Sequence, residues 1–382
     1  MINLEQLPKL KIEQQKEAEI SQEYVRIAEQ ALRGYLALKP EEKTLIIKDN
    51  KTNKETAAIL EKAIDSIGSK RGEIFLSKKI TRKDIQQLLK QYETIISAAG
   101  ESHDADAEIY DDIKETGNRL LALFDLDKEA FRPDGPIAEN TDELTERLNK
   151  MEMLLKEAVG FKITSGYGTN LDVPLRAFGE RRWVKETGVI DKPGEWGNLP
   201  VGEIYTTPDE FKVNGVLVLP VLESTIKQHQ GVDEFIRLTV NDGLIIAIDG
   251  GKSADILRKR LTKASKEDMK ENKDPWRPYR IAEIAFGANS KARSTVSDPS
   301  QPYNYPGVSI VEAEKRFGTM HIAFGDAKHG EEGTEGFFGA SSHYDFVIPR
   351  NGLTVEMFIR EHDYKNKNNG KKIINDGGIN YF

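Results

Sequence analysis

Hydrophobic and polar positions follow two alternating patterns in the first third of the chain. Four short apolar runs, each typical of a buried strand, lie within residues 44–50, 72–77, 93–100 and 119–126. Amphipathic segments separate and flank them, so we predict helices over 11–36, 55–68, 80–92, 107–118 and 140–158, the last of which closes the unit. Strands and helices that alternate at roughly 25-residue spacing predict a doubly wound, mostly parallel α/β domain.

The pattern changes near residue 158, after which strand-like runs follow one another closely. They are FKITSG, RAFGERRWV, GEIYTT, VNGVLVLP, GLIIAIDGG, IAEIAFGAN, GTMHIAFGD and YDFVIPR. Asn214-Gly215 and Asp242-Gly243 are dipeptides typical of hairpin turns, and one helix is predicted over 253–269. We therefore predict two domains: an N-terminal α/β domain over 1–158, and a C-terminal, largely antiparallel α+β domain over 159–382 that carries the chemistry.

Composition narrows the function classes. The 382 residues include no cysteine, which excludes disulfides, thiolate metal sites and cysteine nucleophiles. The net charge of −8 is opposite in sign to that of a typical nucleic-acid binder. The sequence has no apolar run near 18 residues and no signal-like N-terminus, so we expect a cytoplasmic protein without a membrane segment or a nucleic-acid partner.

The histidines are unevenly distributed. Three of the six, His321, His329 and His343, fall within 23 residues. His343 and Asp345 are two positions apart at the start of a predicted strand, so both side chains should point to the same face. Imidazole and carboxylate ligands suit a divalent metal ion; the alternative is a hydrogen-bonded core histidine and an exposed pair. His103 lies in an acid-rich segment typical of a solvated loop, so we expect no metal ligand from the N-terminal domain.

Two glutamates occur in apolar surroundings. Glu203 precedes the strand-like IYTT, and Glu283 lies inside IAEIAFG. A buried carboxylate needs a proton, a cationic partner or a metal ion. The alternatives are a turn residue for Glu203 and an outward-facing strand position for Glu283.

Five motifs, in this order, resemble the aminopeptidase T/S (PepS-like) family of metallo-aminopeptidases. They are GTNL (168–171), GNLPVGEIYTTP (197–208), AEIAFGAN (282–289), EKRFGTMHIAFG (314–325) and SSHYDFVI (341–348). The resemblance implies a homodimer with a two-metal site in the C-terminal domain. The implied ligands are Glu203, Glu283, His321, His343 and Asp345, and the two glutamates would also serve in catalysis.

The chain departs from that family at two positions. The tyrosine that the family carries seven residues after its first histidine is Lys328 here, followed by His329 as a possible substitute ligand. The acid that precedes the first glutamate is Gly202. These departures mark a divergent member of the family.

Three functions are compatible with these residues. The main hypothesis is an aminopeptidase that hydrolyses peptides with two zinc, cobalt or manganese ions, which activate a bound water. The second is a mononuclear iron(II) ring-cleaving dioxygenase of dihydroxypyridine type, because His321, His343 and Asp345 match a two-histidine, one-carboxylate triad. The third is a family member that has lost catalysis, which the replacement by Lys328 would favour.

Overall fold

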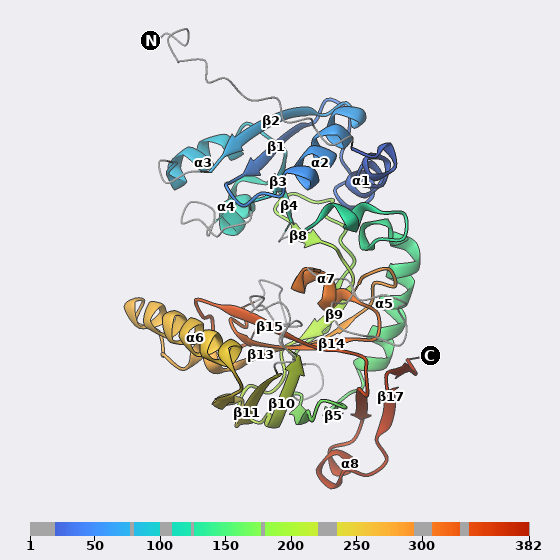
Figure 1. The fold of residues 1–382 in the computed structure, drawn as a ribbon, viewed down its shortest axis with the longest axis vertical. Helices are drawn as coiled ribbons and strands as arrows, with labels where there is room; N and C mark the ends of the chain where they lie inside the picture. Colours follow the sequence, from blue (N-terminus) through green and yellow to red (C-terminus); the bar gives the residue numbers. More distant parts are fainter. Residues whose placement is uncertain are drawn as a thin grey trace.

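The N-terminal part of the chain forms a parallel sheet with helices packed against it (Figure 1). The computed structural model describes residues 20–76, 80–99, 109–123, 126–176, 180–220, 235–293, 308–328 and 336–381. The parallel sheet has the order β2-β1-β3-β4-β8. Its strands are β1 (Lys43–Lys48), β2 (Lys70–Phe75), β3 (Thr94–Ser97), β4 (Arg119–Leu123) and β8 (Trp196–Leu199). The predicted α/β class is confirmed, but the fifth strand comes from a segment where we predicted none.

The helices of this part begin and end where local chemistry favours it. The side chain of Asn53 accepts hydrogen bonds from two backbone amides at the start of α2, and Gly68 ends that helix in the left-handed conformation. The helices are α1 (Gln22–Tyr35), α2 (Lys54–Ile67), α3 (Arg82–Leu89) and α4 (Ile109–Thr116), with 3-10 turns η2 (Lys128–Phe131) and η3 (Pro136–Ala138).

The helix predicted over 140–158 is present as α5 (Thr141–Leu155), but its packing differs from our expectation. It contacts β7 (Val184–Glu186) and β9 (Glu203–Thr206), and it runs beside the C-terminal sheets in Figure 1. Its buried face, which includes Leu144, Leu148 and Met151, belongs to the main core. The helix therefore joins the two halves of the chain, because its apolar stripe packs on the C-terminal half.

Two antiparallel sheets make up the C-terminal part. The larger has the order β12-β11-β10-β6-β5-β16-β17-β18, and the smaller, which we call the site sheet, has the order β15-β14-β13-β9-β7. The strands of the larger sheet are β5 (Gly160–Thr164), β6 (Asn170–Pro174), β10 (Asn214–Pro220), β11 (Phe235–Asn241), β12 (Leu244–Asp249), β16 (Thr354–Phe358), β17 (Lys371–Asn375) and β18 (Gly378–Ile379). Besides β7 and β9, the site sheet contains β13 (Ile281–Gly287), β14 (Met320–Gly325) and β15 (His343–Ile348). Three helices, α6 (Lys252–Lys270), α7 (Ile310–Lys315) and α8 (Glu361–Asn366), and the turn η5 (Arg277–Tyr279) complete this part.

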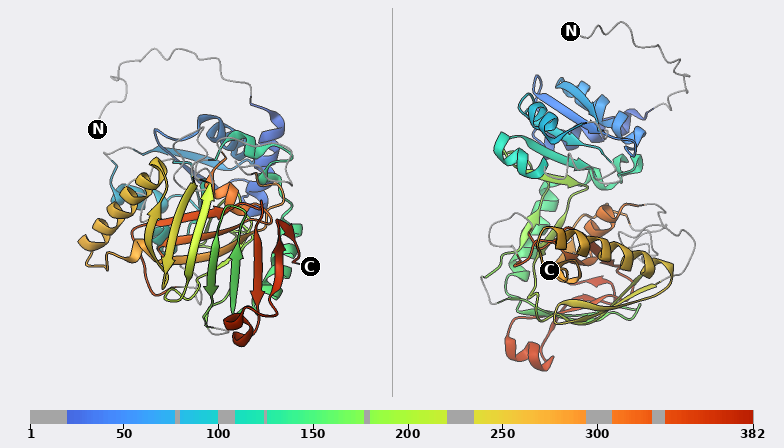
Figure 2. Two further views of the ribbon diagram at one scale, coloured as in Figure 1. Left: turned by 60° about the horizontal axis from the view of Figure 1, so that its bottom comes forward. Right: turned by 90° about the vertical axis from the view of Figure 1, so that its left-hand side faces the viewer.

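The site sheet buries one face against the larger sheet, as Figure 2 shows from two sides. Ile284 and Phe286 of β13 and Ile322 and Phe324 of β14 belong to that shared core, and the rings of Phe286 and Phe161 lie 5.7 Å apart. Side chains alternate across a strand, so the intervening residues point to the opposite face, toward the N-terminal part. This opposite face carries the polar residues described below.

Local predictions in this half had mixed outcomes. Asp242 and Gly243, both with positive φ, form the predicted two-residue turn between β11 and β12. Asn214-Gly215 is not a hairpin turn, because it begins β10 instead. The domain boundary at 158/159 stays a prediction. Among the residues that the structure describes, no helix combines the length and the apolar character needed to cross a bilayer.

Candidate metal centre

Strand register brings the predicted site residues onto one face of the site sheet. Glu283 of β13 pairs with Ala323 of β14, which in turn pairs with Asp345 of β15, so these three share a row. His321 lies two positions from Ala323 on the same face. A bulge between Ile281 and Glu283 shifts the register at this point, and bulges commonly redirect a side chain beside a functional site.

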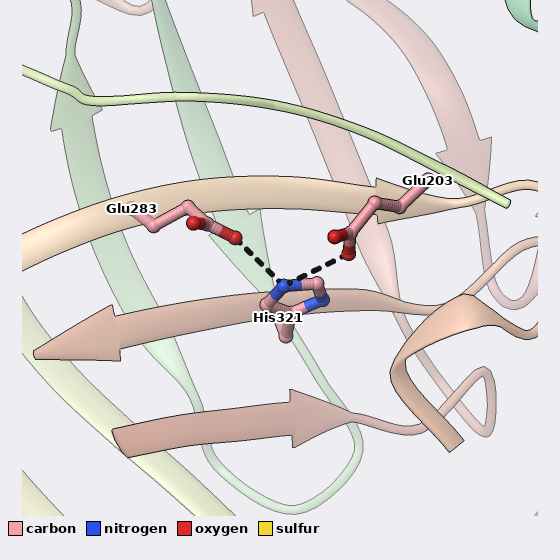
Figure 3. A group of neighbouring side chains, drawn as sticks. All are labelled: Glu203, Glu283 and His321. Carbon is pink, nitrogen blue, oxygen red and sulfur yellow. Dashed lines mark hydrogen bonds and ion pairs between the residues drawn. The ribbon is translucent and has the colours of Figure 1, made fainter. Parts of the chain in front are cut away.

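His321 lies between the two glutamates that the sequence singled out (Figure 3). Its Nε2 atom is 2.9 Å from Glu283 Oε1 and 3.4 Å from Glu203 Oε2. All three side chains are buried. The alternatives of a turn residue and an outward-facing strand position do not describe these glutamates.

His343 and Asp345 form a second pair next to the first. His343 Nε2 lies 3.1 Å from Asp345 Oδ1 and 3.9 Å from Glu283 Oε2. The other ring nitrogen of His343, Nδ1, is 2.8 Å from the backbone carbonyl of Asp326. A carbonyl can only accept, so Nδ1 carries a proton. Burial acts to lower the pKa of His343, but the charge and hydrogen bond of Asp345 raise it well above its usual range, so Nε2 is also protonated and a metal ion would take the place of that proton.

A buried lysine borders the same cluster. Lys315, the last residue of α7, lies 2.5 Å from Glu203, 2.9 Å from Glu186 and 3.0 Å from Glu314, in each case from Nζ to a carboxylate oxygen. Sequence reasoning missed Glu186, which ends the three-residue strand β7. It also missed Glu314 and Lys315, because α7 is short and polar and its hydropathy gives no sign of burial. The only signal was that Glu314 and Lys315 open the motif EKRFGTMHIAFG.

The concentration of carboxylates sets the charge of this face. Burial acts to lower the pKa of His321, but its hydrogen bond with Glu283 and the charges of Glu203 and Glu314 raise it to about 9. Burial raises the pKa of Glu186 to about 7 and that of Glu314 to about 8, against the opposing charge of Lys315. The face thus attracts positive charge, either as protons or as a cation.

The donor set fits a divalent metal ion. Three overlapping groups each place their ligand atoms within 4.8 Å of one another: Glu203, Glu283 and His321; Glu283, His343 and Asp345; and Glu314, His321 and Asp345. In the described part of the chain, Nδ1 of buried His321 has no hydrogen-bond partner. Mixed imidazole and carboxylate donors suit zinc, manganese and iron(II) alike, so the geometry alone does not select the metal.

The cluster opens into a cavity of about 680 Å³ between the site sheet and β8 of the parallel sheet. Its lining includes Trp196 and Tyr205 as aromatic residues and Lys328 among the basic ones. This volume lies within the range that holds a small organic ligand. The N-terminal part contributes to the wall through Lys114, although no group with ligand spacing in the described residues includes a residue before Glu203. His103 and His329 lie outside the described residues.

Gly202, one of the two departures from the aminopeptidase pattern, has a structural reason. Its φ of +117° is strained for any other residue, and an added Cβ would lie 3.0 Å from the Cβ of Asn289. Asn289 cannot easily move, because its amide donates to the carbonyls of Pro136 and Val201. A glycine is therefore needed at the entrance to β9 to place Glu203.

Comparisons with known proteins give the family. The family model described as NicX, 2,5-dihydroxypyridine 5,6-dioxygenase, matches residues 24–336. A curated 2,5-dihydroxypyridine 5,6-dioxygenase of Pseudomonas putida is 31% identical over 185 residues, which are 48% of this chain. The matched region spans 47%, or about half, of that relative's length.

Two solved structures share the fold. The structure of 2,5-dihydroxypyridine dioxygenase from Pseudomonas putida KT2440 matches with a TM-score of 0.65 and 19% identity, over 93% of this chain and 96% of that chain. Wild-type AmpT from Thermus thermophilus matches with a TM-score of 0.62 and 14% identity, over 94% of this chain and 98% of that chain. At these identities the likeness concerns the fold alone.

The family match overturns the main hypothesis from the sequence. The assignment to the aminopeptidase T/S family, the hydrolase class and the peptide substrate are wrong, because the family model and the curated relative are both dioxygenases. The motifs misled us for a physical reason: the two groups share this fold, and short motifs on strands report the fold more directly than the reaction.

Proposed function

Because the chain belongs to the 2,5-dihydroxypyridine 5,6-dioxygenase family, we propose that it is a ring-cleaving dioxygenase of a dihydroxypyridine or a closely related aromatic diol. In this proposal His321, His343 and Asp345 hold one iron(II) ion. A dioxygenase places both atoms of O₂ in the ring-opened product, so the reaction needs no external reductant.

One observation supports this proposal most strongly. Two imidazoles and one carboxylate from neighbouring strands β14 and β15 face the same cavity, and Nδ1 of His343 is already committed to the Asp326 carbonyl. Two histidines and one carboxylate with open positions are the ligand set of non-haem iron(II) oxygenases. Bound iron(II) would supply the one-electron chemistry by which O₂ reacts with an electron-rich ring.

The chain's own residues would orient the ligands and the substrate. Glu283 lies 2.9 Å from His321 Nε2 and 3.9 Å from His343 Nε2, so its carboxylate is close enough to both imidazoles to complete the set of ligands. Trp196 and Tyr205 offer aromatic faces against which a flat ring can pack. Lys328, in the place of the aminopeptidase tyrosine, brings a positive charge to the same cavity, where it would favour an ionised hydroxyl of the substrate.

Two further expectations stay predictions: the homodimer that the aminopeptidase resemblance implied, and the cytoplasmic location. The expectation of two zinc, cobalt or manganese ions is replaced here by one iron(II) per chain. Three overlapping groups of carboxylates and imidazoles with ligand spacing support a metal ion at this face.

Oxygen consumption tests the proposed reaction. Metal is removed from the full-length protein with a chelator, and the protein is reloaded under anaerobic conditions with iron(II) or, as a control, with zinc. Each sample is then mixed with 2,5-dihydroxypyridine in an oxygen electrode. We expect equimolar loss of O₂ and of substrate absorbance with iron(II) and none with zinc. Equal rates with both metals, or no oxygen uptake by fully iron-loaded protein, would refute the proposal.

A further inference from the structure

Lys315 is an unusual group to find buried among the described residues. Its side chain is only 1% exposed, yet Nζ contacts carboxylates of three different elements: Glu186 of β7, Glu203 of β9 and Glu314 of α7. A lysine is seldom buried so completely unless it is paired, because removal of an ammonium from water costs several kcal/mol. Three carboxylates within 3.0 Å offset that cost and fix the position of the charge.

The carboxylates around Lys315 also belong to the candidate metal centre. Glu203 reaches Lys315 through Oε1 and approaches His321 through Oε2, at 3.4 Å. Glu314 falls in one ligand group with His321 and Asp345. The ammonium and a metal ion held by the histidines would thus lie on opposite sides of shared carboxylates. In a two-metal centre, the second metal ion would lie where the ammonium lies here.

The fold holds α7 tightly in this position. The backbone carbonyl of Lys315 accepts a hydrogen bond of 2.7 Å from the amide of Asn289. Gly287 of β13 permits this approach, since an added Cβ there would lie 2.2 Å from the carbonyl oxygen of Arg316. At the other end of the helix, Ser309 caps α7 and the buried pair of Arg293 and Glu312 anchors it. The ammonium is therefore placed by rigid backbone contacts rather than by a flexible surface side chain.

We infer that the Lys315 ammonium occupies the second cation position of the centre and so restricts the chain to one metal ion. This inference rests on the proposed function only for the identity of that ion. It gives a structural reason for a one-metal centre on a fold for which the aminopeptidase resemblance implied two. The site keeps the acids that a second ion would need, but the Lys315 ammonium lies among them.

Metal stoichiometry tests the inference without any activity measurement. Metal is removed from the full-length wild-type protein and from the Lys315→Met variant. Both are then equilibrated by gel filtration in buffer of fixed Mn²⁺ concentration, and the number of Mn²⁺ ions per chain is measured. Methionine has nearly the length of lysine but no charge, so Glu186, Glu203 and Glu314 would be left to bind a cation. We expect one ion in the wild type and two in Lys315→Met.

A matched control separates this effect from a general loss of positive charge. Lys185 of β7 also lines the cavity, but its Nζ pairs with Glu152, 2.6 Å away. Lys185→Met should bind one ion, like the wild type. Two ions in the wild type, or one ion in a Lys315→Met variant with native circular dichroism, would overturn the inference.

The wild type alone can still overturn the inference if Lys315→Met does not fold. Electron paramagnetic resonance of the Mn²⁺-saturated protein should show isolated ions, and a spin-coupled pair would overturn the inference. The outcome is independent of the reaction. If the wild type binds one ion but consumes no O₂ with iron(II), the dioxygenase proposal is refuted and the inference on Lys315 is not. If the wild type binds two ions and cleaves the ring, the inference on Lys315 is refuted and the dioxygenase proposal is not.

Discussion

Replacement of Asp345 by asparagine isolates the contribution of one charge to metal binding. Asp345 Oδ1 lies 3.1 Å from His343 Nε2, so an ion bound to that imidazole would be a close neighbour of the carboxylate. At an effective dielectric constant of about 20, one unit charge about 4 Å from a divalent ion contributes about 8 kcal/mol before solvation is counted.

The net loss should be smaller than that figure. Asparagine keeps an oxygen that can act as a ligand, and its neutrality relieves the repulsion of Asp345 from neighbouring carboxylates in the metal-free protein. We expect a net cost of about 3–4 kcal/mol, which corresponds to a dissociation constant raised by roughly two to three orders of magnitude.

Competition with a chromogenic chelator would measure the Mn²⁺ or iron(II) dissociation constant of Asp345→Asn and of the wild type without oxygen. Asp363→Asn is a control, because Asp363 is an ion-paired acid of the same half of the chain that does not line the cavity. The control should bind the ion with wild-type affinity. If folded Asp345→Asn binds the ion within threefold of the wild type, Asp345 is not a ligand and the proposed triad is wrong.

Three further outcomes follow from the same geometry. Gly202→Ala should lower the free energy of unfolding by about 2–4 kcal/mol, because of backbone strain and the contact with Asn289. Gly34→Ala in α1, where the atom nearest to the added Cβ would lie 3.8 Å away, should not lower it, and equal urea midpoints for the two variants would contradict the argument. Chelation should lower the thermal midpoint, because an ion at about 100 times its dissociation constant stabilises the native state by about 2.7 kcal/mol; a midpoint insensitive to chelator and to added iron(II) would argue against a bound ion. Trp196→Ala should raise KM for the diol about fivefold with little change in kcat, the scale of one lost aromatic contact, and an unchanged KM would remove Trp196 from the substrate site.

The architecture followed from the sequence wherever an element has a clear apolar pattern, either a continuous run in a buried strand or one face of a helix. The alternation of short apolar runs with amphipathic helices predicted the parallel sheet, and Gly68 correctly marked the end of α2. The pattern did not predict β8, which joins the parallel sheet from a distant part of the chain. A four-residue strand that contains Gly197 and an exposed Trp196 has little periodicity to detect.

The predicted site residues were those whose chemistry conflicts with their surroundings. Glu203 and Glu283 attracted attention as acids within apolar runs, and His343 and Asp345 as a pair on one strand face; the structure brings all four together with His321. Lys315 could not be found in this way, because its burial depends on how α7 packs on β13 and β15. The reaction was misjudged because ligand residues on strands predict a metal centre but not the reaction that the centre serves.

Isotope labelling tests the central claim most directly. Iron(II)-loaded protein is mixed with 2,5-dihydroxypyridine under ¹⁸O₂, and the product is analysed by mass spectrometry. The account predicts a ring-opened product that carries two ¹⁸O atoms from one O₂ molecule, with allowance for exchange of carbonyl oxygen with water. A product without label, or a protein that instead releases amino acids from peptides, would contradict it.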